Sequence, residues 1–158
     1  MKFEFSAGGI VYKSAEDNMY ILVAQHSQHH GWVFPKGLIG DTIEKESKEE
    51  TALREVEEET GVLGKILNPL TPVTYWYVWP REAGTRSAGE KEKRKKTVYY
   101  FLMEFVSGDI TKHDHEMEAV EWLPVDEVEK RLSFKTDKQT WDEARKILAS
   151  NLELKTAN

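Results

Sequence analysis

The sequence predicts a single mixed α/β domain, in which a mostly antiparallel sheet carries helices on both faces. Several segments are rich in aromatic and β-branched residues, a composition typical of strands. A central segment has helix signals at both of its ends. The strands flank this central helix and are followed by a helical C-terminal part, which is the element order of a mixed sheet covered by helices.

Strands are predicted at residues 3–12, 19–26, 72–79, 97–105 and 119–124. The polar sequence KSAEDN joins the first two strands and indicates a hairpin. The segment GWVFPKGLIGD contains one proline and three glycines, so we expect a loop there after a short strand. Residues 80–96 form a long polar segment that we also expect to be a loop, and loops of this length are usually functional or mobile.

The central helix is predicted to run from residue 48 to residue 60. Ser47 is followed three residues later by Glu50, which is the spacing of a capping box. Gly61 is a natural C-terminal stop, because glycine readily adopts the left-handed conformation that ends many helices. Two further helices are predicted at residues 125–132 and 140–152.

Composition indicates an ordered protein of 158 residues, with 39% hydrophobic and 32% charged residues. The net charge of −6 is unevenly spread, since acids crowd residues 44–59 and bases crowd residues 91–96. An acidic total with a local acidic cluster argues against nucleic-acid binding and for a cation site. Cysteine is absent, and no apolar run approaches the roughly 20 residues of a membrane span. The first residues lack a signal-peptide layout, so we expect a cytoplasmic protein.

Residues 52–60 place three carboxylates together on one helix. At about 100° per residue, one stripe is apolar and faces the sheet, and it holds Ala52, Leu53, Val56 and Thr60. An adjoining stripe holds Glu55, Glu58 and Glu59. Like charges at these spacings repel one another, and a hard divalent cation such as Mg²⁺ would remove the repulsion. A solvated acidic face that binds nothing is the alternative interpretation.

The surrounding residues carry a family pattern. From Gly40 the chain continues with five residues, Glu46, seven residues and then REVEEETGV from Arg54 to Val62. This resembles the Nudix box, G-x5-E-x7-R-E-U-x-E-E-x-G-U with U aliphatic, at every fixed position. The segments SAGGIVY, WVFPKG, KKTVYYFL and HEMEAVEWLP also resemble Nudix hydrolases in the right order, and most closely the diadenosine tetraphosphate hydrolases.

The resemblance implies a Nudix-type α/β/α sandwich with a catalytic loop-helix-loop. We expect a single domain at residues 1–150 and a short tail at residues 151–158. It further implies hydrolysis of a phosphoanhydride bond in a nucleoside diphosphate linked to another group. The cofactor is expected to be Mg²⁺, with Mn²⁺ as a substitute. The expected partner is a small nucleotide, with neither nucleic acid nor membrane, and the chain is a monomer or a homodimer.

Catalytic roles are implied for Glu55, Glu58 and Arg54. In the resemblance, Glu58 and Glu59 coordinate Mg²⁺, while Glu55 is either a ligand or the group that orients or deprotonates the attacking water. Arg54 is expected to hold Glu55 or Glu46, and Glu46 to brace the loop. Gly40 and Gly61 are the structural glycines of the box.

The remaining metal ligands are expected outside the helix. Glu116 matches the distal acid of such sites, and its alternative is an ordinary loop carboxylate. A main-chain carbonyl is also expected to face the metal. Gly37 resembles the first box glycine by its neighbouring residues, whereas Gly40 is the glycine at the right spacing. The match of the neighbouring residues assigns the metal-facing carbonyl to Lys36.

Substrate binding is predicted for Lys36, Lys96, Tyr100 and Trp76. Lysine can meet phosphate oxygens and an aromatic ring can stack on a base. The alternatives are a core aromatic for Tyr100 and a solvated hairpin tip for the basic stretch 91–96. His26, His29 and His30 suggest a phosphate contact more than zinc, which usually takes a closed set of nitrogen and sulfur ligands.

The favoured function is cleavage of a dinucleoside polyphosphate such as diadenosine tetraphosphate. Alternative substrates are oxidised nucleoside triphosphates, nucleotide sugars and diphosphoinositol polyphosphates, the last suggested by the basic stretch. A Nudix module that binds nucleotides without catalysis is a further alternative, but such modules typically lose box glutamates and this chain keeps them all.

Overall fold

The computed structural model describes residues 2–40, 43–80 and 91–156. Eight strands of these segments form one mixed sheet: β1 (Lys2–Ala15), β2 (Asn18–His26), β3 (Trp32–Val33), β4 (Lys36–Leu38), β5 (Val62–Pro69), β6 (Val73–Pro80), β7 (Lys91–Gly108) and β8 (Met117–Pro124). Strands β1 and β7 run parallel, and every other described pair is antiparallel. The predicted mixed, mostly antiparallel sheet is therefore confirmed.

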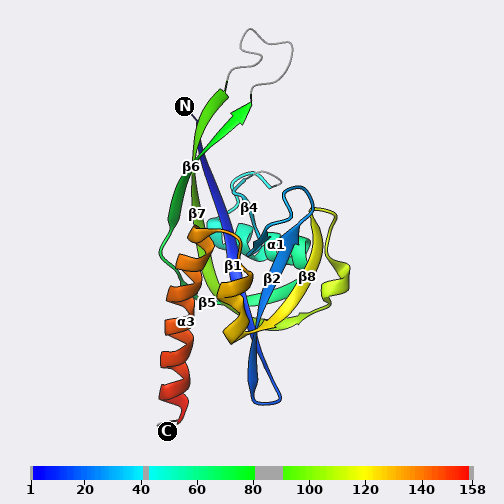
Figure 1. Ribbon diagram of the computed structural model, residues 1–158, viewed down its shortest axis with the longest axis vertical. Coiled ribbons are helices and arrows are strands. Elements are labelled where there is room, and N and C mark those ends of the chain that lie inside the picture. The colour runs from blue at the N-terminus through cyan, green and yellow to red at the C-terminus, as the bar shows by residue number, and fades with distance from the viewer. Residues whose placement is uncertain (1, 41–42, 81–90, 157–158) are drawn as a thin grey trace.

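Helices lie on opposite faces of this sheet (Figure 1). The helix α1 (Lys48–Thr60) buries Ala52 and Val56 against one face, in a core with Ala7 and Val11. The helix α3 (Lys135–Thr156) buries Trp141, Ala144 and Leu148 against the other face. A short helix α2 (Val128–Arg131) follows a 3-10 turn, η2 (Val125–Glu127), and a second 3-10 turn, η1 (Ile110–Lys112), precedes β8. This is the predicted α/β/α sandwich.

The central helix has the predicted bounds and caps. The Ser47 side chain accepts a hydrogen bond from the backbone N–H of Glu50, and the Glu50 side chain accepts one from the backbone N–H of Ser47. Gly61 ends the helix in the left-handed conformation, with a φ of 79°. Because these signals are local, the sequence alone was sufficient to predict them.

The prediction that residues 91–96 belong to a loop is wrong. These residues form the first part of β7, which pairs with β1 on one side and β6 on the other. A basic stretch can form a strand here because alternate side chains on one face are neutralised by an acid. Arg94 and Lys96 lie 2.8 and 3.8 Å from the Glu4 carboxylate. The rest of the predicted loop, residues 81–90, lies outside the described residues.

Three further differences concern element boundaries. Residues 62–69, which we did not assign to a strand, form β5, and part of the expected loop 31–41 forms β4 beside β1. The C-terminal helix begins five residues earlier than residue 140, at Lys135. It continues to Thr156, so most of the expected tail is helical, and residues 157–158 lie outside the described part. None of the described helices is long and apolar enough to cross a membrane.

Candidate functional site

Two glutamates of α1 face inward beside the sheet. Glu55 is 8% exposed and Glu59 is 2% exposed, whereas the Glu58 side chain is 46% exposed. The helix spacing brings these residues to one side, but only Glu55 and Glu59 enter the layer between α1 and β4. Both line a cavity of about 240 Å³ together with Glu116, Lys36 and Lys96.

Strand β4 packs directly against these carboxylates. The backbone N–H of Lys36 donates a hydrogen bond of 3.1 Å to Glu59 Oε2. In an extended strand the N–H and C=O of one residue point to the same side, so the Lys36 carbonyl faces the same layer as Glu59. A Cβ at Gly37 would lie 2.1 Å from Glu55 Cδ, so only glycine leaves room for the buried carboxylate.

Gly40 has a different structural requirement. Its φ is 76°, a left-handed value that glycine adopts readily, but no heavy atom lies within 4 Å of where its Cβ would be. Gly37 and Gly40, the two possible assignments of the first box glycine, therefore have separate roles. Gly37 provides space for Glu55, and Gly40 provides the turn at the right spacing.

Arg54 joins the acids that surround the cavity. Its Nε and Nη2 each donate a hydrogen bond of 2.9 Å to Glu46, a bidentate arrangement. Its Nη1 lies 3.0 Å from Glu55 Oε1 and 3.1 Å from Glu58 Oε2. The expectation that Arg54 holds Glu46 or Glu55 is thus met for both residues. Glu46 also accepts a 2.7 Å hydrogen bond from Thr51, which attaches the loop before α1 to the helix.

Glu116 reaches the cavity from the segment before β8. Its carboxyl group lines the same cavity as Glu59. Burial raises the pKa of Glu59 well above its ordinary value, and the neighbouring Glu116 raises it further. Burial also raises the pKa of Glu55, against the lowering effect of Arg54.

These features fit a divalent cation. Buried carboxylates close together are costly without a compensating positive charge, and oxygen ligands suit a hard divalent ion. Among the residues that the structure describes, however, no three acidic or histidine side chains are already arranged around one metal position. Glu58 in particular pairs with Arg54 and faces a separate groove beside Lys112 and Asp114. It would have to turn away from Arg54 to join Glu55 and Glu59.

Two lysines bring positive charge to the same cavity. Lys36 and Lys96 line it from β4 and β7, together with the glutamates. Burial lowers the pKa of Lys96, and the charge of Lys36 lowers it further, while Glu4 opposes both effects. Lysines placed in this way can neutralise phosphate oxygens.

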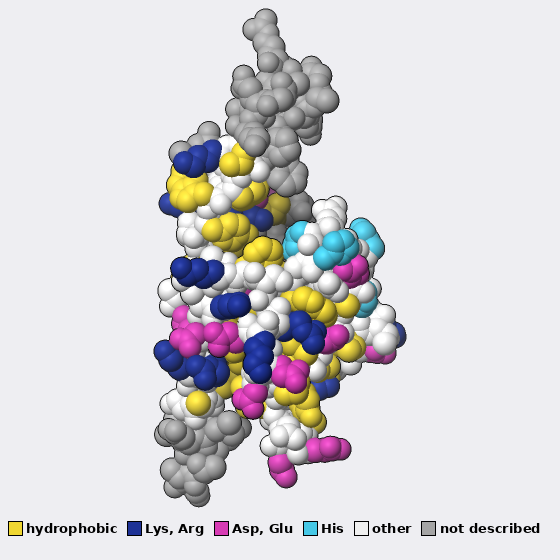
Figure 2. Space-filling model, viewed as in Figure 1, with side chains coloured by type: hydrophobic (Ala, Val, Ile, Leu, Met, Phe, Trp, Pro, Cys, Tyr) yellow, Lys and Arg dark blue, Asp and Glu magenta, His cyan; other side chains and the backbone are white. Residues whose placement is uncertain are grey.

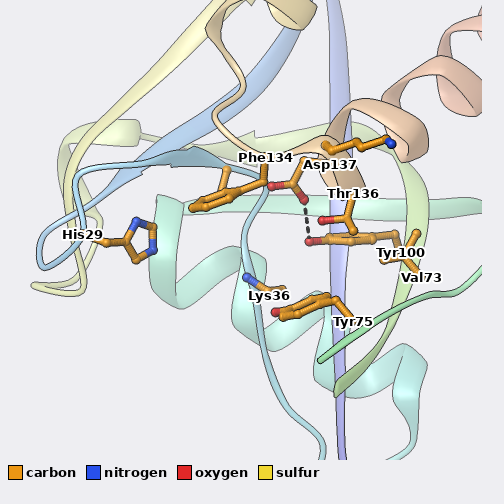
Figure 3. A pocket seen from close by; sticks show the side chains of 10 residues that line it. His29, Lys36, Val73, Tyr75, Tyr100, Phe134, Thr136 and Asp137 are labelled. Carbon is orange, nitrogen blue, oxygen red and sulfur yellow. Dashed lines mark hydrogen bonds between the residues drawn. The ribbon is translucent and has the colours of Figure 1, made fainter. Parts of the chain in front are cut away.

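A second cavity of about 370 Å³ adjoins the first and has aromatic walls. The two share His29, Val33 and Lys36. Figure 3 shows Tyr75, Tyr100 and Phe134 around it, with Asp137 and Thr136 at the start of α3. Sequence reasoning missed Tyr75, Phe134 and Asp137. Alternation along β6 was an available signal for Tyr75, but nothing local indicated that the start of α3 meets β6 and β7.

Tyr100 and Trp76 do not provide the stacking faces that we expected. Tyr100 lines the aromatic cavity, but it is 1% exposed and its hydroxyl donates a 3.1 Å hydrogen bond to Asp137. Trp76 is 47% exposed, lies on the face of β6 opposite Tyr75 and lines neither cavity. The lysine at position 93 has its Nζ 4.7 Å from the Trp76 ring centre. Phe134, at 43% exposure, offers a more accessible ring.

Histidines gather at one edge of the face seen in Figure 2. His26 and His29 stack with ring centres 4.2 Å apart, and both line the carboxylate cavity. The backbone N–H of Gly31 donates to His29 Nδ1 at 2.9 Å. His30 lies on the far side of this turn, 2.6 Å from Glu118. His29, where the two cavities meet, is thus the histidine best placed to contact a ligand.

Two known proteins are similar to this chain in sequence. A protein named MutT4 from Mycobacterium tuberculosis is 31% identical over 153 residues, which cover 92% of this chain and 56% of that protein. The chain thus spans little more than half of that relative's length. The asymmetrical bis(5'-nucleosyl)-tetraphosphatase of Rattus norvegicus is 33% identical over 132 residues, or 82% of this chain and 80% of that protein.

A solved structure and a family match extend the comparison. The Ap4A hydrolase of C. elegans, in a binary complex, superposes with a TM-score of 0.66 at 20% identity, covering 93% of this chain and 98% of that chain. This likeness shows the fold. Residues 2–147 match the NUDIX domain, which is nearly the whole described chain. With the complete box on α1 and its preceding loop, the chain belongs to the Nudix family.

Proposed function

We propose that this chain is a Mg²⁺-dependent pyrophosphohydrolase that cleaves dinucleoside polyphosphates, with diadenosine tetraphosphate as the substrate. One observation carries the proposal: a carboxylate cavity with two lysines adjoins an aromatic cavity, and the two meet at Lys36 and His29. A nucleotide needs both environments side by side, one for its phosphates and one for its base. The similarity to the rat tetraphosphatase supports this choice of substrate.

The carboxylates would hold the cation. Glu55, Glu59 and Glu116 line the cavity, the Lys36 carbonyl faces it, and Glu58 would complete the set after leaving Arg54. When bound, the divalent ion supplies charge neutralisation of the phosphate chain and lowers the pKa of coordinated water. Mn²⁺ is expected to substitute, because it accepts the same oxygen ligands.

The remaining residues position the reactants. Lys36 and Lys96 bind phosphate oxygens and so reduce the charge that builds on the leaving group. Glu55 either binds the cation or holds the attacking water, because its buried carboxylate faces the cavity. Arg54 acts as a positioning residue by fixing the orientation of Glu55 through the 3.0 Å ion pair. Phe134 and Tyr75 offer their rings to the base.

A substrate panel tests the proposal. Purified protein with Mg²⁺ is incubated with diadenosine tetraphosphate, 8-oxo-dGTP, a nucleotide sugar and a diphosphoinositol polyphosphate, and products are separated by ion-exchange chromatography. We expect diadenosine tetraphosphate to be cleaved asymmetrically into ATP and AMP, with the highest kcat/KM of the panel. Activity should disappear with EDTA and return with excess Mg²⁺.

Two matched variants compare the loss of a carboxylate in the cavity with the loss of one on the exposed surface of the helix. Glu59→Gln removes a buried carboxylate of the cavity, whereas Glu49→Gln changes an exposed glutamate in the first turn of the same helix. Only the first should abolish turnover. A kcat/KM for 8-oxo-dGTP well above that for diadenosine tetraphosphate would refute the substrate assignment. Absence of cleavage of every compound would refute hydrolysis itself.

A further inference from the structure

Asp137 is the one acidic side chain among the described residues that line the aromatic cavity. It is 5% exposed and lies in the first turn of α3. Its Oδ1 accepts a hydrogen bond of 3.1 Å from the Tyr100 hydroxyl, as Figure 3 shows. The box pattern and the expected metal site do not account for this buried carboxyl group.

The second carboxyl oxygen, Oδ2, has no donor. No described side chain or backbone N–H forms a hydrogen bond with it. In Figure 3 this oxygen is turned away from Tyr100, toward Phe134, which also lines the cavity. Among the described residues, Oδ2 is not one of the fully buried side-chain atoms that lack a partner, so it keeps access to the cavity. A donor on a ligand in the cavity could therefore reach it.

The walls of the cavity restrict what that ligand can be. Tyr75 and Phe134 suit a flat ring, and Val33 and Val73 add apolar walls. When it is ionised, the Asp137 carboxylate accepts a hydrogen bond from an amino group and repels a keto oxygen. Adenine carries an exocyclic amino group at C6, and guanine carries one at C2.

We propose that Asp137 determines base specificity by accepting a hydrogen bond from the exocyclic amino group of a purine nucleotide. The proposal rests on the proposed function, because it takes the aromatic cavity to be the base site of the same enzyme. A purely structural role is the alternative, in which Asp137 only holds Tyr100 and the first turn of α3. Burial raises the pKa of Asp137 while Lys36 opposes this, which agrees with a carboxyl group kept out of water beside a ligand cavity.

Nucleotide pairs that differ only in the amino group test the proposal. Titration calorimetry with Mg²⁺ compares AMP with purine riboside monophosphate, and GMP with IMP. The wild-type protein should bind the amino-bearing member of at least one pair about 10-fold more tightly, the usual effect of losing a hydrogen bond to a buried charged group. The pair that shows the difference identifies the base.

The variant Asp137→Asn tests whether Asp137 causes the tighter binding of the amino-bearing nucleotide. The asparagine carbonyl can still accept from Tyr100, which places its amide NH₂ group toward the cavity, where it meets the amino group of the base as a second donor. The preference should fall to within about 2-fold or reverse. Asp142→Asn is the matched control, since Asp142 lies on the same helix but is exposed and pairs with Arg145 and Lys146.

Tyr100→Phe separates base recognition from structural support. It removes the hydrogen bond to Asp137 Oδ1 but leaves Oδ2 in the cavity, so the amino-group preference should persist. Equal binding within both nucleotide pairs by the wild-type protein would overturn the proposal, and so would an undiminished preference in Asp137→Asn. The substrate panel gives separate outcomes. If the protein cleaves the nucleotides but shows no preference for the amino group, only the role of Asp137 is refuted. If it shows the preference but cleaves nothing, only the proposed hydrolase activity is refuted.

Discussion

The backbone N–H of Lys36 and the carboxylate of Glu59 are joined by a 3.1 Å hydrogen bond that fixes β4 against α1. The contact connects the segment just before the box pattern to the box helix, 23 residues later in the sequence. It places the flexible lysine side chain, the following glycine and two buried glutamates around one cavity.

Gly37→Ala should lower kcat/KM by about 100-fold or more, because a Cβ would lie 2.1 Å from the Glu55 carboxyl carbon and displace it. Gly40→Ala is the control. Its Cβ meets no atom within 4 Å, so its main effect should be about 1 kcal/mol of lost stability from its left-handed φ of 76°. Steady-state kinetics and urea unfolding measure the two effects, and equal loss of activity in both variants would contradict this assignment.

Glu59→Gln should raise the thermal midpoint of the metal-free protein while lowering turnover by several orders of magnitude. The substitution removes a carboxylate whose pKa is raised by burial and by Glu116, and so relieves repulsion. Thermal unfolding with and without MgCl₂ measures the effect. Mg²⁺ should stabilise the wild-type protein but not the variant. A variant that fails to fold would show that Glu59 is a structural residue.

Arg54→Ala should destabilise the protein by about 3 kcal/mol, because it leaves the buried carboxylates of Glu46 and Glu55 without their partner. The Arg54 side chain is only 14% exposed, so solvent screens these pairs weakly. Arg145→Ala removes an exposed ion pair with Asp142 and should produce no measurable loss. Chemical denaturation of both variants tests the difference, and similar curves would argue against a role for Arg54 in stability.

Glu46→Gln should lower stability at neutral pH, and the deficit should shrink in acid. Hydrogen bonding to Arg54 lowers the pKa of Glu46 below its ordinary 4.5. A depressed pKa in the folded state stabilises the protein above the ordinary value, and this contribution is lost as the pH falls through the lowered value. The two unfolding free energies should therefore differ most at pH 7 and converge below pH 4.5. A difference independent of pH would contradict the ion pair.

Local features of the chain were predictable because neighbouring residues determine them. The bounds of α1 follow from Ser47, Glu50 and Gly61, whose backbone contacts span three or four residues. The spacing of Glu55 and Glu59 on one side of a helix follows from its 3.6-residue repeat. The family pattern and the expectation of a cation site therefore came from the sequence alone.

The tertiary structure decided which of these side chains share a cavity. Residues 36, 59, 96 and 116 meet only because β4, α1, β7 and the start of β8 are brought together by the register of the sheet. The same packing buried Tyr100 and placed Asp137 in the aromatic cavity. Sequence periodicity describes one element at a time, whereas burial and contact depend on which elements pack together.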